Sequence, residues 1–197
     1  MSQTNRKPRE KTRAADARSE ILAVAARMMR QVGYSDMSLR DLATEVGMKA
    51  GSLYYHFSSK DALAAEVMKL GVEVVQAAVR TELQSHEDAS PRDRLVIAMR
   101  VHLETLLLES DFSSAHIRCY PFVPNSVRTE LTEVRRAYDR DWNTLISAFL
   151  EVPQDDLQVR YLRHALLGAL NWSLEWFDPK RDSVAPYITS LDRLISR

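Results

Sequence analysis

Long stretches of this chain contain neither glycine nor proline, and within them apolar residues recur at the spacing of an amphipathic helix. Only 5 glycines occur among 197 residues, and 45% of the residues are hydrophobic. A strand-and-turn architecture needs more turn residues than this, and a disordered chain has fewer apolar ones. The sequence therefore predicts an all-α protein with a substantial core.

The helical pattern divides the chain into segments. Residues 1–14 are polar and basic, and we expect them to form a flexible arm. A first helix precedes Gly33, and Ser59 is placed to cap a long helix that ends at the polar break 85–91. Residues 110–125 are expected to be irregular, because Pro121 and Pro124 limit helix there. The remaining helices are expected over these ranges: 38–46, 50–57, 91–109, 126–150, 155–177 and 183–196.

Composition excludes several classes of protein. The only cysteine is Cys119, so neither an intrachain disulfide nor a multi-cysteine zinc site is expected, and nothing indicates a cofactor. No apolar run reaches the roughly 18–20 residues that span a bilayer. Residues 1–9 lack the apolar core of a secretory signal, so we expect a cytoplasmic protein. Residues 1–60, the head of the chain, hold 11 Lys/Arg and 6 Asp/Glu, a net charge of +5, and the remaining residues have a net charge of −5. This asymmetry favours a polyanion as the partner of the head.

An enzyme is the first rival to a binding protein. His102-Leu103-Glu104 superficially resembles the start of a deaminase site, but no Pro-Cys-x-x-Cys follows it. The chain also lacks Gly-x-Ser-x-Gly, His-Glu-x-x-His and a phosphate-binding glycine loop. We therefore expect no enzymatic activity.

Two short helices joined by a tight turn, behind a first helix, match the helix-turn-helix plan. Ser38 is placed to cap the first short helix, with Asp41 three residues on, and Gly47 to end it. In the second, Gly51 and Ser52 are small enough to let the helix approach a phosphate backbone closely. The head therefore has the form of a DNA-reading device.

Residues 38–63, SLRDLATEVGMKAGSLYYHFSSKDAL, closely resemble the DNA-binding head of TetR-family regulators, and Gly33-Tyr34 fit the same pattern. The resemblance implies a three-helix DNA-binding domain over 15–62 and a ligand-binding and dimerisation domain over 63–197. Family members are homodimers that bind palindromic operators, usually as repressors, and release DNA when a small molecule binds. Operator DNA, a second copy and an effector are therefore the expected partners, with no membrane. A ligand-independent or activating regulator remains the alternative.

The resemblance also assigns candidate DNA contacts. Groove or base-edge contacts are expected from Arg40, Lys49, Ala50, Ser52 and Tyr54, and phosphate contacts from Ser38, Tyr55, His56 and Lys60. Arg40 is the best candidate for base readout, because arginine pairs bidentately with guanine. Three alternatives stay open: either tyrosine as a partly buried aromatic, Arg40 as a solvated surface residue, and Lys60 as a partner of Asp61. The arm's basic residues are either a solvated tail or a further DNA contact.

The segment 155–177 is apolar nearly all round, which predicts burial on all sides. Because so small a domain cannot cover it alone, we expect a partner chain to do so in a four-helix interface about a two-fold axis. The alternative is an intrachain core. The expected interface residues are Ala165, Gly168, Ala169, Trp172, Trp176, Tyr187, Leu191 and Leu194.

A ligand pocket is expected among the helices around 91–109, 115–123 and 126–150, closed by 155–177. Its candidate residues are mostly apolar or aromatic with a few polar groups, as in small-molecule sites. They are Met99, His102, Leu103, Leu106, His116, Cys119, Tyr120, Phe122, Tyr138, Trp142, Asn171, Trp172 and Glu175. For His102 the alternative is a hydrogen-bonded core histidine. Residues 166–179 are also similar to the dimer helix of family members that control lipid, sterol or acyl-CoA metabolism, which favours an apolar, acyl-type effector such as an acyl-CoA.

Overall fold

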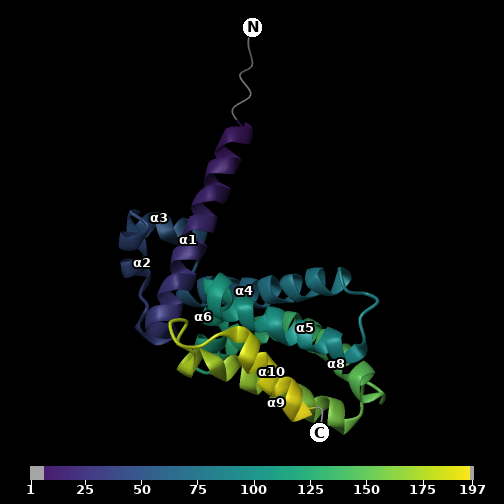
Figure 1. Cartoon of the computed structure of the whole chain (residues 1–197). Coiled ribbons are helices and arrows are strands. Elements are labelled where there is room, and N and C mark those ends of the chain that lie inside the picture. The colour runs from purple at the N-terminus through teal and green to yellow at the C-terminus, as the bar shows by residue number, and fades with distance from the viewer. Residues whose placement is uncertain (1–6, 196–197) are drawn as a thin grey trace.

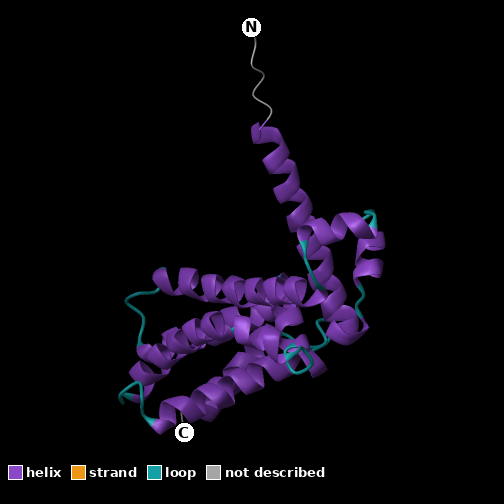
Figure 2. Cartoon of the chain, turned by 180° about the vertical axis from the view of Figure 1, so that it is seen from behind, coloured by secondary structure: helices purple, strands orange, loops and turns teal. Residues whose placement is uncertain are grey.

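The computed structural model describes the backbone of residues 7–195 and the side chains from residue 15 onward, and this part of the chain is all-helical, as predicted. The helices of the head are α1 (Lys7–Asp36), α2 (Leu39–Glu45) and α3 (Ala50–His56). The body contains α4 (Lys60–Gln84), α5 (Pro91–Glu104), a π-helical turn η1 (Thr105–Glu109), α6 (Asp111–Cys119), α7 (Asn125–Glu130), α8 (Thr132–Leu150), α9 (Leu157–Trp176) and α10 (Val184–Ile195). The head lies at one end of the body, and α4 runs from the head along the body (Figure 1). Figure 2 shows the same arrangement from behind, without a strand in the described part.

Helix α1 begins earlier than the sequence indicated. Residues 7–14, which we expected to belong to a flexible arm, are helical, and the arm's first six residues lie outside the described part. The reason is local: arginine, alanine, glutamate and lysine, all good helix formers, make up residues 9–20 except for Thr12, Asp16 and Ser19. At Gly33 the backbone takes φ 80° and ψ 173°, which is not helical, so the regular part of α1 ends there as predicted. Glycine adopts this conformation readily, whereas residues with a side chain strongly disfavour it.

Serine caps begin the short and long helices at the predicted residues. The Ser38 hydroxyl accepts a hydrogen bond from the Asp41 backbone N–H (3.1 Å), and it donates to the Asp41 carboxylate (2.6 Å). The Ser59 hydroxyl accepts from the Ala62 backbone N–H (3.0 Å) at the start of α4. Gly47 follows α2 with φ 72°, in the left-handed region that glycine commonly adopts just after the end of a helix.

The expectation that residues 110–125 are irregular is wrong for most of that segment. Ser110 caps α6 by accepting from the Ser113 backbone N–H (3.2 Å), and both prolines lie beyond the end of α6, where they do not interrupt it. Pro124 instead precedes α7. The single helix expected over 126–150 is divided into α7 and α8 at Leu131, whose backbone remains near-helical.

Two clusters of buried side chains hold the chain together. The first joins α1–α4 to Ala115 and Cys119 of α6 and to α7, so the head rests on body helices and not on a flexible linker. The second lies within the body around Leu95, Met99 and Trp142. The expected domain boundary after residue 62 falls inside α4, a continuous helix. Among the described residues, no helix has both the length and the hydropathy that a membrane crossing requires.

Candidate nucleic-acid interface and ligand pocket

Helix α3 divides its aromatic side chains between two faces. Leu53 is fully buried and Phe57, which follows the helix, nearly so, whereas Tyr54 is 57% and Tyr55 85% exposed. Both side chains are thus mainly exposed, which does not favour the alternative that either tyrosine is a partly buried aromatic. The other expected groove contacts are exposed as well: Arg40, Lys49, Ala50 and Ser52. The head thus exposes hydroxyl groups on α3, the helix expected in the major groove, with Lys49 at its N-terminus and Arg40 on α2.

The expected phosphate contacts are more varied in their surroundings. The Lys60 ammonium donates to the Ser35 backbone carbonyl (3.0 Å) and lies 4.4 Å from the centroid of the Tyr34 ring. It does not pair with Asp61, whose carboxylate accepts from the Tyr34 hydroxyl (2.5 Å). Burial and this carboxylate raise the pKa of Tyr34 to about 12. Lys60 is therefore held against the C-terminal end of α1, beyond Gly33.

His56 and Ser38 are also engaged within the head. The His56 ring is partly exposed and packs edge-on against Tyr55 at 5.5 Å between centroids. The Ser38 hydroxyl is occupied by the α2 cap, although the residue remains partly exposed. Ser38 precedes the N-terminus of α2, where backbone N–H groups can meet phosphate, whereas His56 is the last residue of α3, where only its side chain could do so.

Arg18 of α1 is a residue that the sequence analysis did not single out. Its guanidinium donates to the His56 backbone carbonyl (2.8 Å), pairs with Glu66 of α4, and lies 4.2 Å from the centroid of the Phe57 ring. One side chain therefore connects the C-terminal end of α3 to α1 and α4. No local pattern marks it, because its partners lie 38 and 48 residues away.

Helix α9 presents an apolar stripe that the chain itself does not cover. Leu157 is 59%, Tyr161 63% and Trp172 68% exposed, while Leu166 and Leu170 on the opposite face belong to the body core. Among the other expected interface residues, the exposed ones are Ala165, Gly168, Trp176 and Leu194. The exposed part of α9 is thus one stripe and not its whole circumference.

Three expected interface residues are engaged within the chain. Leu191 of α10 packs in the body core, so its assignment to a surface interface is wrong: α10 turns this side chain inward beside Ile188. Ala169 and Tyr187 are partly buried, and the Tyr187 hydroxyl donates to the Ala169 carbonyl (2.9 Å). This bond and the edge-on contact of Tyr187 with Trp176 (4.9 Å between centroids) join α10 to α9.

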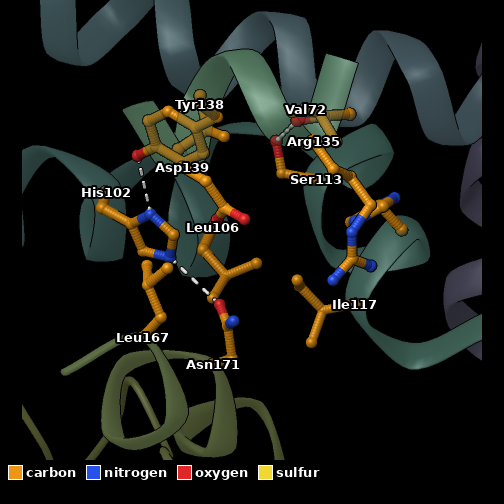
Figure 3. Close-up of a pocket in the computed structure, with 13 residues that line it drawn as sticks. Val72, His102, Leu106, Ser113, Ile117, Arg135, Tyr138, Asp139, Leu167 and Asn171 are labelled. Carbon is orange, nitrogen blue, oxygen red and sulfur yellow. Dashed lines mark hydrogen bonds between the residues drawn. The ribbon is translucent and has the colours of Figure 1, made fainter. Parts of the chain in front are cut away.

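A pocket of about 70 Å³, measured to the centres of water-sized molecules, lies between α4, α5 with η1, α6, α8 and α9. Figure 3 shows its polar groups converging with aliphatic side chains around one space. Of the candidates expected from the sequence, it brings together His102, Leu106, His116, Tyr138 and Asn171.

A hydrogen-bonded chain crosses one wall of the pocket. His102 Nδ1 lies 2.9 Å from the Tyr138 hydroxyl, and His102 Nε2 lies 3.0 Å from Asn171 Oδ1 (Figure 3). Burial lowers the pKa of His102 to about 4, so the ring is neutral near pH 7. Because the Asn171 oxygen can only accept, Nε2 carries the proton, and Nδ1 accepts from the Tyr138 hydroxyl. His102 is thus both a satisfied core histidine and a pocket residue.

The other expected ligand residues do not line this pocket. Met99, Leu103 and Trp142 are wholly buried in the body core. Cys119 packs beneath the head, where its thiol donates to the Met29 carbonyl (3.4 Å) and burial raises its pKa to about 11. Tyr120 packs against the head's core, with the Arg135 guanidinium 3.7 Å from its ring centroid. The last three line a separate surface hollow beside the end of α1: Phe122, Trp172 and Glu175.

Three pocket residues were missed because they come from α4, which was not expected to line the pocket, and others were missed although their segments were expected there. Helix α4 contributes Gly71, Val72 and Val75, and the Gly71 carbonyl accepts a hydrogen bond from Ser113 of α6 (2.8 Å). A glycine within a long helix was the one available signal, since such a glycine usually marks a close approach of another backbone. The remaining missed residues are Ile117, Arg135, Asp139 and Leu167.

Comparison with known proteins agrees with this architecture. Residues 21–67 match the model of bacterial regulatory proteins of the tetR family, and residues 88–181 match that of the tetracyclin repressor-like C-terminal domain. The HTH-type transcriptional repressor KstR2 of Rhodococcus jostii (strain RHA1) is 25% identical over 189 residues, which is 88% of either chain. The fatty acid metabolism regulator protein of Bacillus subtilis (strain 168) is 21% identical over 184 residues, covering 90% of this chain and 93% of that protein.

A solved structure shares the fold at full length. The crystal structure of AibR in complex with isovaleryl coenzyme A and operator DNA superposes with a TM-score of 0.77 at 20% identity, and the match covers 90% of this chain and 97% of that one. The two matching models together cover most of the chain, from the DNA-reading helices to the pocket and α9. The chain therefore belongs to the TetR family of DNA-binding transcriptional regulators, which are not enzymes.

Proposed function

We propose that this chain is a ligand-responsive repressor, which binds a palindromic operator as a homodimer and releases it when a small molecule occupies the pocket. The observation that carries the proposal is the course of α4. This single helix begins at the Ser59 cap, three residues after α3, and lines the pocket at Gly71, Val72 and Val75 (Figure 1). A displacement of α4 at the pocket therefore moves α3, the helix expected to read DNA.

DNA reading is assigned to α3. The exposure of Tyr54 and Tyr55, together with exposed Arg40 and Lys49, supports a role in groove and backbone contacts. In a dimer on B-DNA the two α3 helices would stand about 34–36 Å apart, one helical turn of the duplex. An effector that favours another spacing releases the operator, since both heads no longer fit at once.

A second copy of the chain is the proposed cover for the apolar stripe of α9. A stripe with three large exposed apolar side chains is unusual for a monomer, and Gly168 lies within it where no atom of the described part of the chain approaches its Cβ position within 4 Å. Small residues at such a place let two helices pack closely. Related by a two-fold axis, α9 and α10 of both copies would form a four-helix interface.

The proposed effector is a small apolar or acyl-type molecule. The pocket's aliphatic walls with a few polar groups support this class. The relatives also support it: one is named as a regulator of fatty acid metabolism, and the structurally similar AibR was crystallised with isovaleryl coenzyme A.

The first test is a mobility shift with DNA from upstream of the gene. Tyr54→Ala should weaken specific binding by about 10- to 100-fold, as expected when a contact worth about 1–3 kcal/mol is lost. Phe122→Ala, which removes an equally exposed aromatic outside the head, should bind as the native chain does. Acyl compounds, including acyl-CoAs, should release the DNA. Specific binding that no small molecule relieves would favour a ligand-independent regulator, and a reporter assay separates repression from activation.

The dimer is tested by two changes at one residue. Gly168→Arg places a charged chain in the stripe and should give a monomer in sedimentation analysis, while Gly168→Ala should keep the dimer. Both changes raise helix propensity, so neither is expected to unfold α9. A dimer that survives Gly168→Arg would place the interface elsewhere.

A further inference from the structure

The pocket holds a guanidinium whose hydrogen-bond donors are unused. Arg135 of α8 lines the pocket, yet among the described residues it forms no ion pair and donates no hydrogen bond. Its guanidinium lies 3.7 Å from the Tyr120 ring centroid, a contact that positions the cation. The carboxylate one turn further along, Asp139, pairs with Arg163 at 3.6 Å. A positive charge is thus held beside the pocket without a partner of opposite charge.

A second donor faces the same space. Because Asn171 Oδ1 accepts from His102 Nε2, the Asn171 amide group is fixed with its NH₂ away from that bond. Among the described residues no acceptor takes this NH₂. In Figure 3 the guanidinium of Arg135 and the amide of Asn171 lie on either side of the space bounded by Leu106 and Ile117.

An unsatisfied buried atom lies in the same wall. His116 is about 95% buried by exposure (5% exposed) and lines the pocket, and its Nδ1 has no hydrogen-bond partner among the described residues. Its ring also bonds to the backbone of Met68. Burial and the charge of Arg135 lower the pKa of His116 to about 3, so Arg135 acts on this wall electrostatically. In this neutral ring Nδ1 is an acceptor, so it is satisfied by a donor such as a water molecule, and the anion-binding groups of the pocket are Arg135 and Asn171.

We propose that the pocket recognises a short carboxylic acid in its anionic form, with the carboxylate on Arg135 and Asn171 and the hydrocarbon against Leu106, Ile117 and Leu167. The planar guanidinium fork matches a carboxylate, and the Asp139 carboxylate that lines the same pocket is paired with Arg163. The volume of about 70 Å³ holds on the order of five water molecules, which suits a short acid. The inference rests on the pocket being the effector site of the proposed function.

The test measures ligand binding and DNA release separately on the full-length protein. Butyrate, isovalerate and benzoate are compared with their neutral amides and with inorganic phosphate, by thermal shift and calorimetry. The variant is Arg135→Gln, and the control is Arg136→Gln, which removes an exposed arginine paired only with Glu133 (3.0 Å). Arg135→Lys keeps the charge without the fork, and the unfolding midpoint without ligand shows that each variant folds.

At least one acid is expected to raise the unfolding midpoint where its amide does not. Its dissociation constant should rise about 10- to 100-fold in Arg135→Gln, less in Arg135→Lys, and stay unchanged in Arg136→Gln. Equal binding by acid and amide, binding of phosphate alone, no binding of any acid, or an unaffected Arg135→Gln would overturn the inference.

DNA release then distinguishes this inference from the proposed function. If an acid binds through Arg135 but leaves the operator complex intact, the carboxylate site stands and its proposed role in release fails. If acyl-CoAs release the DNA and no acid binds, the proposed function stands and the carboxylate inference fails.

Discussion

Gly71 is where α4 and α6 approach most closely, and replacing it by alanine tests the packing that connects the head to the pocket. A Cβ at this residue would lie 2.2 Å from the Phe112 carbonyl oxygen, 2.7 Å from the Phe112 carbonyl carbon and 3.0 Å from His116 Cβ. Ordinary contact begins at 3.4 Å, so the backbone of α6 must move by about an ångström or α4 must shift. The Ser113 hydroxyl, which donates to the Gly71 carbonyl at 2.8 Å, lies in the same contact.

The two contributions to Gly71→Ala have opposite signs. Overpacking costs about 1–3 kcal/mol, and the better helix propensity of alanine returns about 0.5–1 kcal/mol. We therefore expect the free energy of unfolding to fall by about 1–2 kcal/mol and the thermal midpoint by about 2–8 °C. Urea unfolding at one fixed protein concentration measures the change.

Gly51→Ala is the matched control. No atom lies within 4 Å of its Cβ position, so the same chemical change should leave stability unchanged or raise it by up to about 1 kcal/mol. If Gly71→Ala proved as stable as Gly51→Ala, the contact between α4 and α6 would be looser than the structure shows. The proposed transmission of movement from the pocket to the head through this contact would then lose its physical basis.

Three further predictions concern the head and the pocket. Arg18→Leu should lower operator affinity about tenfold in fluorescence anisotropy, because the His56 carbonyl loses the hydrogen bond that holds the end of α3. The free energy of unfolding should change by only about 1 kcal/mol. Unchanged affinity would show that Arg18 does not position α3. Tyr34→Phe should cost about 1–2 kcal/mol in urea unfolding, since Asp61 loses a 2.5 Å hydrogen bond. Unfolding free energy should fall as pH drops from about 6.5 toward 4, because His102 and His116, with pKa values lowered to about 4 and about 3, take up protons there mainly when unfolded; His102→Gln should reduce this slope in thermal unfolding, and an unchanged slope would contradict the neutral His102.

Much of the head was predictable because its signals are local. Ser38 and Ser59 cap their helices as predicted, and Gly33 adopts the conformation that a glycine permits. The alternation of Leu53 and Phe57 with Tyr54 and Tyr55 sorts buried from exposed side chains at helical spacing. These features depend on a few neighbouring residues, and the tertiary structure leaves them unchanged.

Helix boundaries were less predictable where the average composition of a stretch suggested that it was not helical. Polarity at the N-terminus suggested an arm, although its residues from Lys7 onward are helical. Pro121 and Pro124 suggested an irregular segment, although both follow α6 and leave it intact. Charge and proline content describe a stretch on average, whereas the helix ends depend on where individual caps and prolines lie.

By itself, the sequence determined the all-helical class, the caps, the reading helix and the apolar character of α9. Only the tertiary structure decided that Leu191 faces the chain's own core, that Cys119 lies beneath the head, and that Arg135 shares a pocket with Asn171. Helical periodicity states which face of a helix is apolar, but not which helix covers it. The pocket collects residues from five helices, and their meeting depends on crossing angles and close approaches, such as that at Gly71, which no local pattern encodes.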